Sequence, residues 1–430
     1  MNAINEWERS DAPIASYLLY TAYSNLAYID TYTCTVTHNY DFSKYLQKAV
    51  EYYQLISITP VSVEGPFGVA DIRSFACLVG EGAALSEFDQ FLDTAREAAL
   101  YIGQTYHNMY YGYDDLAACE LAFFKNQLDM ARNYAHNAVI RAREKKQHSI
   151  EMMAQYYLLR LAIHDGDYPL TEEILKQLDS HLRNPDFWNR QLLYDLFAGS
   201  FYAHIGVQDK VPSWIVLHEI ETVSQIRIPV RELIVGVRYY FACRKYKQAL
   251  AVLSNSYPRD PQDRFHFGEL TLSLLLAFAR LKTGDTAGAA NAFIKAYEMS
   301  FDGVFEMPFI ELGRALRPLA MIVSEREDTG ISGEWLKAIE RKATIYAKKT
   351  AVVANAYKRD RRIVEPVSLT EREQEVLTDL YHGLSREEIA TNQYLSINTI
   401  KTILNSIFMK LDAGNNVDAI RIALEKKLIE

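Results

Sequence analysis

The first 340 residues alternate between apolar stretches of helix length and short polar turns. Five turns lie near residues 126, 166, 206, 245 and 284, at intervals of 40, 40, 39 and 39 residues. Similar turns occur near 40–42 and 85–88. An apolar helix precedes each turn, as at 152–164, and an alanine-containing helix follows it, as at 287–299. A fixed period of this length predicts a unit of two helices joined by a turn.

These repeats predict an all-α fold. A single helix pair cannot bury its apolar face alone, so neighbouring pairs have to stack into a curved α-solenoid. The sequence holds at least five such units, and seven if the two earlier turns belong to the series.

The last 62 residues have a different pattern, with shorter helices and strong signals for where each helix begins. Thr370 with Glu373, and Ser385 with Glu388, have the spacing of a capping box. Ser396 is a further candidate N-cap, directly before a stretch with helical periodicity. In that stretch the apolar residues Ile400, Leu404, Ile407 and Leu411 share one face. Two short helices, a tight turn near 393–396 and a helix with a polar outer face predict a helix-turn-helix.

This segment resembles the LuxR-type (GerE-like) DNA-binding domain. The shared elements are spread in fixed register over about sixty positions: Leu369-Thr370, Arg372-Glu373, Val376-Leu377, Gly383, Ser385, Glu388-Ile389-Ala390, Ser396, Thr399-Ile400-Lys401, Ile407, Lys410-Leu411 and Ala419. The resemblance implies a four-helix domain whose helix at about 397–411 enters the DNA major groove. It also implies that the last helix, at about 417–427, pairs two copies on a two-fold operator.

The resemblance assigns roles to six side chains of the reading helix and its N-cap. Lys401, Thr402 and Asn405 lie at positions that reach base edges in the family, and Lys and Asn suit contacts to guanine and adenine. Thr399, Lys410 and Ser396 are the predicted phosphate contacts, which position a protein on DNA without reading its sequence.

Some positions depart from the family pattern. Ile403 stands where the family has His, Ser406 where it has Asn, Gln393 where it has an apolar residue, Asp412 where it has Gly, and Asn416 where it has Arg. These departures motivate an alternative: an interaction scaffold whose degenerate helix-turn-helix no longer reads DNA.

Charge is distributed unevenly along the chain. The net charge is −9 overall, but it is −12 for residues 1–340, +7 for 341–362 and −3 for 366–430. The basic segment ends in the patch Lys358, Arg359, Arg361 and Arg362. Such a segment could follow the DNA backbone, or it could dock on the acidic body and hold the reading domain.

The helical repeats resemble tetratricopeptide-type repeats in the long form found in MalT-like LuxR regulators, most closely at 278–298 and again at 312–343. Large MalT-like proteins also carry a nucleotide-hydrolysing module, but no GxxxxGK[ST] motif occurs in this chain. We predict three parts: a tetratricopeptide-like helical sensor domain at 1–340, a basic helical connector at 341–366 and a helix-turn-helix domain at 367–430.

The composition mainly argues against certain classes of protein. The four cysteines form no CxxC pair, which favours buried, reduced thiols, and the first residues lack the pattern of a secretion signal. The ten histidines form no metal-binding motif, and no catalytic motif occurs. We therefore expect a cytoplasmic regulator that is not an enzyme and has no metal, no cofactor and no membrane partner.

Tyrosine is frequent, with 29 residues that include adjacent pairs such as Tyr156-Tyr157. One interpretation is an aromatic groove on the solenoid that binds a small effector or a partner protein. The other is that tyrosine fills the packing between helices. Double-stranded DNA, an unknown effector or protein, and a second copy of the chain on DNA are the predicted partners.

Overall fold

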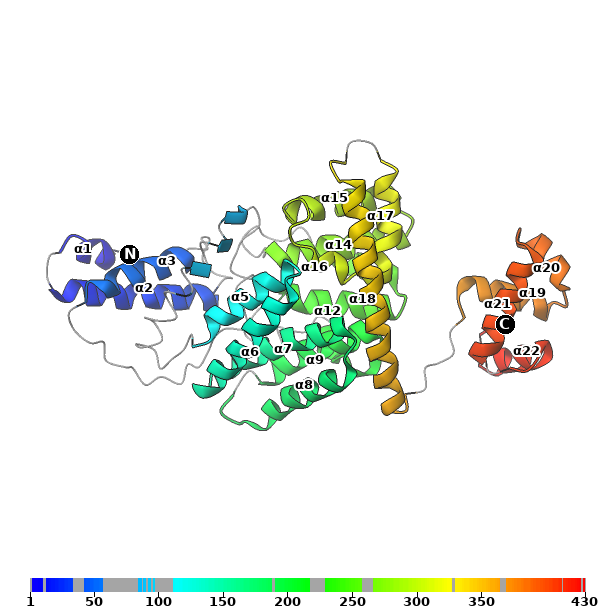
Figure 1. The fold of residues 1–430 in the computed structure, drawn as a ribbon, viewed down its shortest axis with the longest axis horizontal. Helices are drawn as coiled ribbons and strands as arrows, with labels where there is room; N and C mark the ends of the chain where they lie inside the picture. Colours follow the sequence, from blue (N-terminus) through cyan, green and yellow to red (C-terminus); the bar gives the residue numbers. More distant parts are fainter. Residues whose placement is uncertain are drawn as a thin grey trace. The chain divides into compact units, whose positions relative to one another are not determined.

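The computed structural model describes residues 2–10, 13–33, 42–56, 84–86, 88–89, 92–93, 96, 111–187, 190–216, 229–256, 266–326, 329–363, 369–411, 413–426 and 428–429. In these residues the chain forms α-helices and short 3-10 helices and no β-strand, which confirms the all-α fold class (Figure 1). The chain divides into two compact units, Met1–Ala356 and Tyr357–Glu430.

The described residues of the N-terminal unit are mostly helical. Its helices are α1 (Asn2–Trp7), α2 (Pro13–Thr33), α3 (Phe42–Gln54), α5 (Tyr113–Phe124), α6 (Leu128–Glu144), α7 (His148–Asp165), α8 (Tyr168–Ser180), α9 (Arg190–Ile205), α10 (Ser213–Val216), α12 (Pro229–Ala242), α13 (Tyr246–Ser256), α14 (His266–Lys282), α15 (Thr286–Met299), α16 (Met307–Ile310), α17 (Leu316–Ser324) and most of α18 (Gly333–Asp360). Three 3-10 helices are η2 (His181–Arg183), η3 (Gln208–Lys210) and η5 (Gly313–Ala315).

Four of the predicted turns join two packed helices. They connect α5 with α6, α7 with α8, α12 with α13 and α14 with α15. In two of them Gly and Asp act together: Gly166 and Gly284 have φ angles of 76° and 93°, and Asp167 and Asp285 cap the helix that follows. Glycine accepts the left-handed conformation and aspartate satisfies free N–H groups, so the Gly-Asp turns end one helix and begin the next.

The turn near residue 206 ends α9 as predicted, and Gly206 has a φ angle of 73°. After Gly206 the chain forms η3 and α10, which the structure describes as far as Val216, so the second helix of this unit stays a prediction. Pro212 lies between these two short elements. Because proline has no N–H to donate, η3 does not continue through it. The predicted turns at 40–42 and 85–88 include residues outside the described ranges, so the seven-unit count stays a prediction.

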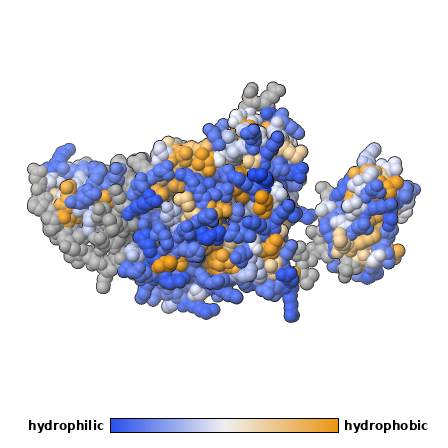
Figure 2. Space-filling model, viewed as in Figure 1, coloured by the Kyte–Doolittle hydropathy of each residue, from blue (hydrophilic) through white to orange (hydrophobic). Residues whose placement is uncertain are grey.

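Tyrosine has a packing role in the first helices. The ring of Tyr20 lies 5.1 Å from that of Tyr53, and Tyr23 stacks on Tyr52 at 5.8 Å. Among the described cysteines, Cys119 is buried, whereas Cys243 is half-buried and so departs from the predicted burial; Cys34 and Cys77 lie outside the described residues. On the face shown in Figure 2, hydrophilic residues cover most of the N-terminal unit and hydrophobic residues form small separate patches.

Helix α18 packs against the other helices of the N-terminal unit through Trp335. Its ring contacts Tyr297 at 4.7 Å and Phe309 at 5.1 Å. Gly303 lies against the same indole, with a φ angle of 91°, and a Cβ atom there would lie only 2.2 Å from Trp335 Nε1. The close approach of this turn to α18 therefore requires glycine.

Gly303→Ala is expected to destabilise the N-terminal unit more than Gly284→Ala. Both glycines have positive φ, so both substitutions introduce backbone strain, but nothing lies within 4 Å of the position of a Cβ atom at Gly284. The clash with Trp335 should add about 1–3 kcal/mol. Urea unfolding followed by tryptophan fluorescence measures the difference, and equal losses in the two variants would contradict the close packing.

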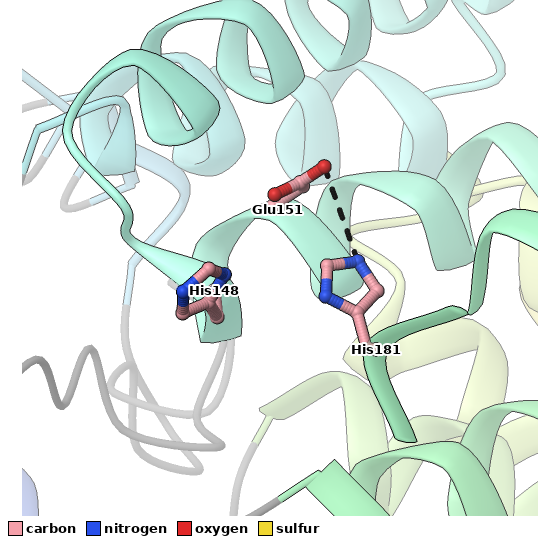
Figure 3. Close-up of side chains that lie close together, drawn as sticks. All are labelled: His148, Glu151 and His181. Atoms are coloured by element: carbon pink, nitrogen blue, oxygen red, sulfur yellow. Dashed lines mark ion pairs between the residues drawn. The ribbon is translucent and has the colours of Figure 1, made fainter. Parts of the chain in front are cut away.

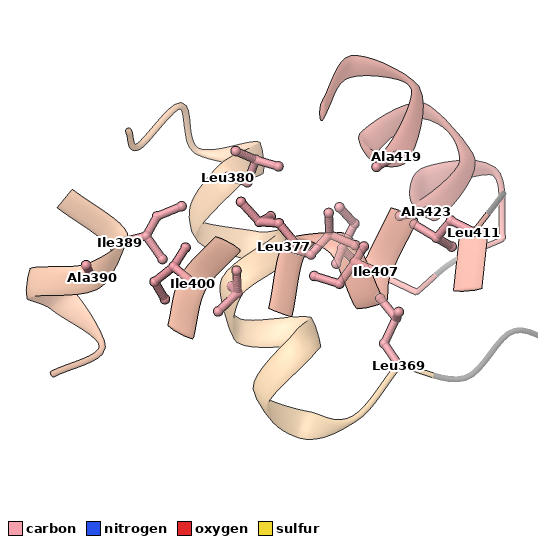
Figure 4. Packing of buried hydrophobic residues seen from close by; sticks show 13 residues of the cluster. Leu369, Leu377, Leu380, Ile389, Ala390, Ile400, Ile407, Leu411, Ala419 and Ala423 are labelled. Atoms are coloured by element: carbon pink, nitrogen blue, oxygen red, sulfur yellow. The ribbon is translucent and has the colours of Figure 1, made fainter. Parts of the chain in front are cut away.

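The C-terminal unit holds α19 (Glu371–Tyr381), α20 (Arg386–Asn392), α21 (Ile397–Leu411) and α22 (Asn416–Glu425). These helices share one hydrophobic core, shown in Figure 4. The predicted stripe Ile400, Leu404, Ile407 and Leu411 lies in this core, with each residue at most 3% exposed. The predicted boundaries at 340/341 and 366/367 stay predictions. Helix α18 runs through the first of them. Among the helices of the described residues, none is both long and apolar enough to cross a membrane.

Candidate nucleic-acid interface

Two capping boxes fix where α19 and α20 begin. The Glu373 N–H donates to Thr370 Oγ1 at 3.2 Å, and the Thr370 N–H donates to Glu373 Oε2 at 2.7 Å. The Ser385–Glu388 pair makes the same two bonds, at 3.3 and 2.7 Å. Both capping boxes predicted from the sequence are confirmed.

The turn between α20 and α21 is tight, as predicted. Tyr394 has a φ of 52°, and the Leu395 N–H donates to the Ala390 carbonyl at 2.9 Å. Ser396 Oγ accepts from the Thr399 N–H at 3.1 Å, which confirms Ser396 as an N-cap. A left-handed residue between the helices reverses the chain, so α21 packs across both α19 and α20.

Helix α21 has one buried face and one exposed face. The buried face is the stripe in the core. Asn398, Lys401, Thr402, Asn405 and Met409 are exposed and follow the spacing i, i+3, i+4, i+7, i+11, so they share the opposite face. The helix therefore presents a row of mainly polar side chains to solvent.

The three predicted base-contacting residues lie together on this exposed face. Lys401 and Asn405 make no hydrogen bond or ion pair within the described part of the chain, and the Thr402 hydroxyl donates to the Asn398 carbonyl at 3.0 Å. An ammonium and an amide one helical turn apart offer donor and acceptor groups to a groove. Their contact with bases stays a prediction.

The three predicted phosphate-contacting residues already have partners within the domain. Ser396 Oγ and Thr399 Oγ1 lie 2.8 Å apart at the start of α21. Lys410 Nζ lies 2.5 Å from Glu373 Oε2 at the other end of the helix. A phosphate at Lys410 would therefore share the ammonium with a carboxylate, and all three phosphate contacts stay predictions.

Glu373 joins α19 to α21, a role that the sequence pattern did not indicate. Its carboxylate is 8% exposed and accepts hydrogen bonds from the Lys410 ammonium, the Thr370 N–H and the Ser406 hydroxyl. Burial opposes its ionisation, but these hydrogen bonds outweigh burial and lower the pKa of Glu373 to about 2. The carboxylate stays charged at neutral pH and holds the two helices together.

Glu373→Gln is expected to reduce the free energy that stabilises the packing of α19 on α21 by on the order of 2 kcal/mol at pH 7. Because the folded-state pKa lies below that of the unfolded chain, the stabilisation is full above about pH 4.3 and is lost as pH falls toward the folded pKa. Hydrogen–deuterium exchange of peptides from 369–411, compared between variant and wild type at each pH, measures this effect.

Glu375→Gln is the matched control, since Glu375 lies on the same helix in an exposed pair with Arg372. Equal exchange in the two variants at pH 7, or a Glu373→Gln effect that stays unchanged below pH 4, would contradict the role of Glu373.

Several departures from the family pattern have roles within the fold. Ser406 donates to Glu373 Oε1 at 2.8 Å, and Ile403 packs against the core. Gln393 links two side chains of α19, because its Oε1 accepts from Arg372 at 2.5 Å and its Nε2 donates to Asp379 at 2.7 Å. Asn416 is the first residue of α22, and Asp412 lies outside the described residues.

Asn398, Tyr394 and Met409 also lie on the exposed surface of α21 or its preceding turn but were not predicted as site residues. Tyr394 is 96% exposed and Met409 is 79% exposed. The sequence could have indicated Asn398, because it lies four residues before Thr402 and therefore on the same face of the helix. Nothing in the sequence indicated that a tyrosine would occupy the left-handed position of the turn.

The predicted connector patch lies at the end of α18. Lys358 is half-buried and Arg359 is exposed, and both belong to the last turn of the helix. The Arg361 guanidinium lies 4.0 Å from the ring centre of Tyr357, and Arg362 has a φ of 52°. Farther back in the basic segment, Lys342 Nζ lies 2.5 Å from Glu306 Oε2 on the N-terminal unit. At Lys342, that pair agrees with the interpretation that the basic segment docks on the acidic body. DNA contact by the patch stays a prediction.

Helix α22 exposes apolar side chains on one face. Val417 is 78% exposed and Leu424 is 40% exposed, and Arg421 lies between them on the same side. The spacing i, i+4, i+7 places these three residues in one row. Ala419 and Ala423 form the opposite, buried face.

One group of described side chains in the N-terminal unit has the composition of a metal site. His148 and Glu151 on α7 and His181 in η2 have ligand atoms within 4.8 Å of one another (Figure 3). Burial lowers the pKa of both imidazoles. Arg143, however, donates to Glu151 at 2.9 Å, and Gln155 contacts His181 at 3.2 Å. A cation would have to displace the guanidinium, so we assign no metal here, and the absence of a metal stays a prediction.

Comparison with known proteins identifies the C-terminal segment. Residues 367–423 match the model of "Bacterial regulatory proteins, luxR family", and these residues form a luxR-family helix-turn-helix domain. "Response regulator protein VraR" from Staphylococcus aureus, Staphylococcus saprophyticus and Staphylococcus epidermidis is 37% identical over 62 residues, which is 14% of this chain and 30% of each relative. The chain thus spans less than a third of these relatives. A luxR-family helix-turn-helix indicates DNA-binding transcription regulation.

Proposed function

Because its C-terminal segment is a luxR-family helix-turn-helix domain, we propose that this chain is a DNA-binding transcription regulator of the cytoplasm that is not an enzyme. The N-terminal helical unit senses a small effector or a partner protein and controls how the C-terminal unit binds an operator.

The exposed face of α21 carries this proposal. Its buried stripe anchors the helix on the domain core, and Lys401, Thr402 and Asn405 lie exposed on the other side. In a helix-turn-helix the second helix enters the major groove, where such side chains reach base edges. Thr399, Ser396 and Lys410 then contact phosphates at the two ends of the helix.

We propose that the N-terminal unit is a tetratricopeptide-type sensor like that of MalT-like regulators. Support comes from the turns at 39- to 40-residue intervals and from the packed helix pairs that four of these turns join. Stacked helix pairs form extended surfaces that bind ligands or proteins.

Pairing of two copies through α22 would raise the affinity for DNA. The domain from 366 to 430 has a net charge of −3, so one copy neutralises few phosphates on its own. A second copy on the other half-site converts weak binding into strong binding. The exposed Val417 and Leu424 support α22 as the contact between copies.

Fluorescence anisotropy of the full chain on DNA tests the function. We compare the intergenic DNA upstream of its own gene with a scrambled sequence of equal length, and titrate each across salt concentrations. Tighter binding to the native DNA, weakening linearly on a log–log plot against salt, is the expected result.

No preference for the native DNA at low salt, with or without cell extract, would reject the regulator. The remaining function would be the interaction scaffold, in which the C-terminal unit docks on a protein. The departures at Ile403, Ser406, Asp412 and Asn416 are the observations that favour it.

A further inference from the structure

Helix α18 lies along the surface of the N-terminal unit and packs on it through one face (Figure 1). Besides the contacts of Trp335, the Tyr346 hydroxyl lies 2.8 Å from His204 Nε2 on α9. The turn at Gly166 also lies against α18, because a Cβ atom at Gly166 would lie 3.3 Å from Lys349 Cβ. These contacts hold α18 at several points along its length, so the direction of its opposite face is determined.

Three cations form one row on that opposite face. Lys337, Arg341 and Lys348 are exposed. Their spacing of i, i+4 and i+11 places them within about 40° of one another around the helix axis, because each residue turns the helix by about 100°. At about 1.5 Å per residue, the row is about 16 Å long. The buried residues of α18 lie on the other side: Leu336, Ile339, Ala343, Tyr346 and Val353.

The cations of the row have no partner. None of the three makes a hydrogen bond or an ion pair with the described residues. One acid in the middle of α18, Glu340, lies 3.4 Å from Arg317, and the other two acids of the helix lie in its first and last turns. Lys342 differs from the row, since its ammonium lies 2.5 Å from Glu306 and so serves the packing of α18. The structure thus separates a docked cation from a row that is free to meet an anion.

The same face has little apolar surface. Ile345 and Val352 border the row and are 46% and 57% exposed. Two such side chains are fewer than the apolar patch of a stable protein interface contains, and the cores of protein interfaces are depleted in lysine. Free cations with few apolar neighbours therefore favour a polyanion over a protein as the occupant of this face.

The place of α18 in the chain favours DNA as that polyanion. Residues 361–368 alone separate the end of α18 from Leu369, and nine peptide steps span at most about 32 Å. One turn of DNA is about 34–36 Å long. The segment from 366 to 430 has a net charge of −3, and its Lys410 is shared with Glu373, so it neutralises few phosphates itself. Cations tethered this closely can add the phosphate contacts that the reading domain lacks.

We propose that Lys337, Arg341 and Lys348 on α18 contact the phosphates of the DNA beside the operator and form a second, sequence-independent anchor. Each cation that neutralises a phosphate releases condensed counterions, which strengthens binding at low salt. The presence of DNA at the C-terminal unit rests on the proposed function, whereas these contacts read no base.

Fluorescence anisotropy of the full chain across salt tests the proposal with the triple variant Lys337→Gln, Arg341→Gln and Lys348→Gln. Each phosphate contact contributes about 0.9 to the slope of log affinity against log salt, so the slope should become shallower by about 2–3. At about 100 mM salt the affinity should fall at least about ten-fold. Because phosphate contacts read no sequence, native and scrambled DNA should lose the same factor, and the preference for native DNA should stay unchanged.

The matched control removes three exposed, unpartnered lysines from α8, η3 and α13: Lys176→Gln, Lys210→Gln and Lys247→Gln. Its slope should stay within about 1 of the wild-type slope. Lys337→Arg with Lys348→Arg keeps both charges and should keep the slope as well. Circular dichroism verifies the fold of each variant. If the triple variant does not fold, the three single Gln variants decide, each with an expected change of about 0.9.

A slope that changes by less than about 1 in the triple variant, or a loss confined to native DNA, would overturn the proposal. Ile345→Ser with Val352→Ser should leave the slope and the affinity unchanged. If that pair weakens binding and the cation triple does not, the face meets a protein. Equal binding of native and scrambled DNA by the wild type would reject the regulator, but the slopes could still be compared on either DNA. The two failures are therefore distinguishable.

Discussion

Glu311→Ala is expected to destabilise the N-terminal unit by about 3–5 kcal/mol, because it leaves two buried arginines without their carboxylate. Glu311 is 5% exposed, and Arg160 and Arg238, its two partners, are 13% and 15% exposed. Burial opposes ionisation of Glu311, but the two guanidinium groups outweigh it and lower the pKa of the carboxyl to about 2. The carboxylate is therefore charged at all ordinary pH values and holds α7 and α12 to the segment that follows α16.

Chemical unfolding followed by tryptophan fluorescence measures this loss, since all four tryptophans lie in the N-terminal unit. Glu340→Ala removes a pair between the half-buried Glu340 and the exposed Arg317, and should change the stability by at most about 1 kcal/mol. A Glu311→Ala variant as stable as Glu340→Ala would show that the buried ion pairs do not hold the unit together.

Lys401→Ala combined with Asn405→Ala is expected to abolish the preference for native over scrambled DNA, with a loss of affinity of at least about 100-fold. Both side chains are exposed and make no hydrogen bond or ion pair with the described residues, so their truncation should leave the fold intact. Each truncation removes a contact worth about 1–3 kcal/mol if the residue reads a base. Anisotropy at fixed salt gives the affinity, and circular dichroism verifies the fold.

Lys426→Ala removes the same charge from the exposed end of α22 and should keep the preference for native DNA. Wild-type discrimination by the double variant would mean that another surface reads the sequence. In that case the exposed residues Asn398 and Tyr394 would be the next to test.

The C-terminal unit could be predicted closely because its signals are local. Each capping box involves residues three positions apart, and the stripe on α21 repeats within one helix. The sequence alone therefore predicted where these helices begin and which face is buried. The turns with Gly and Asp were local in the same way, and so was the turn at Gly206, which ends α9.

The contacts that hold helices together could not be predicted, because they join residues far apart in sequence. Arg160 and Glu311 are 151 positions apart, and Lys410 and Glu373 are 37 apart. Glu373 was identified only as part of a capping box, although the same carboxylate also binds α21. A pattern read along the chain shows which face of a helix is buried, but it does not show which partner that face meets.

The core of the C-terminal unit has an evolutionary consequence. Among the described residues, its cluster of buried side chains comes from residues 369–429, and the helix caps are formed by neighbouring residues of the same segment. A gene fusion or recombination event at the junction before residue 369 would leave every one of those buried contacts in place. Such a segment can be inherited by chains whose other parts differ, and the match to response regulators extends over 62 residues.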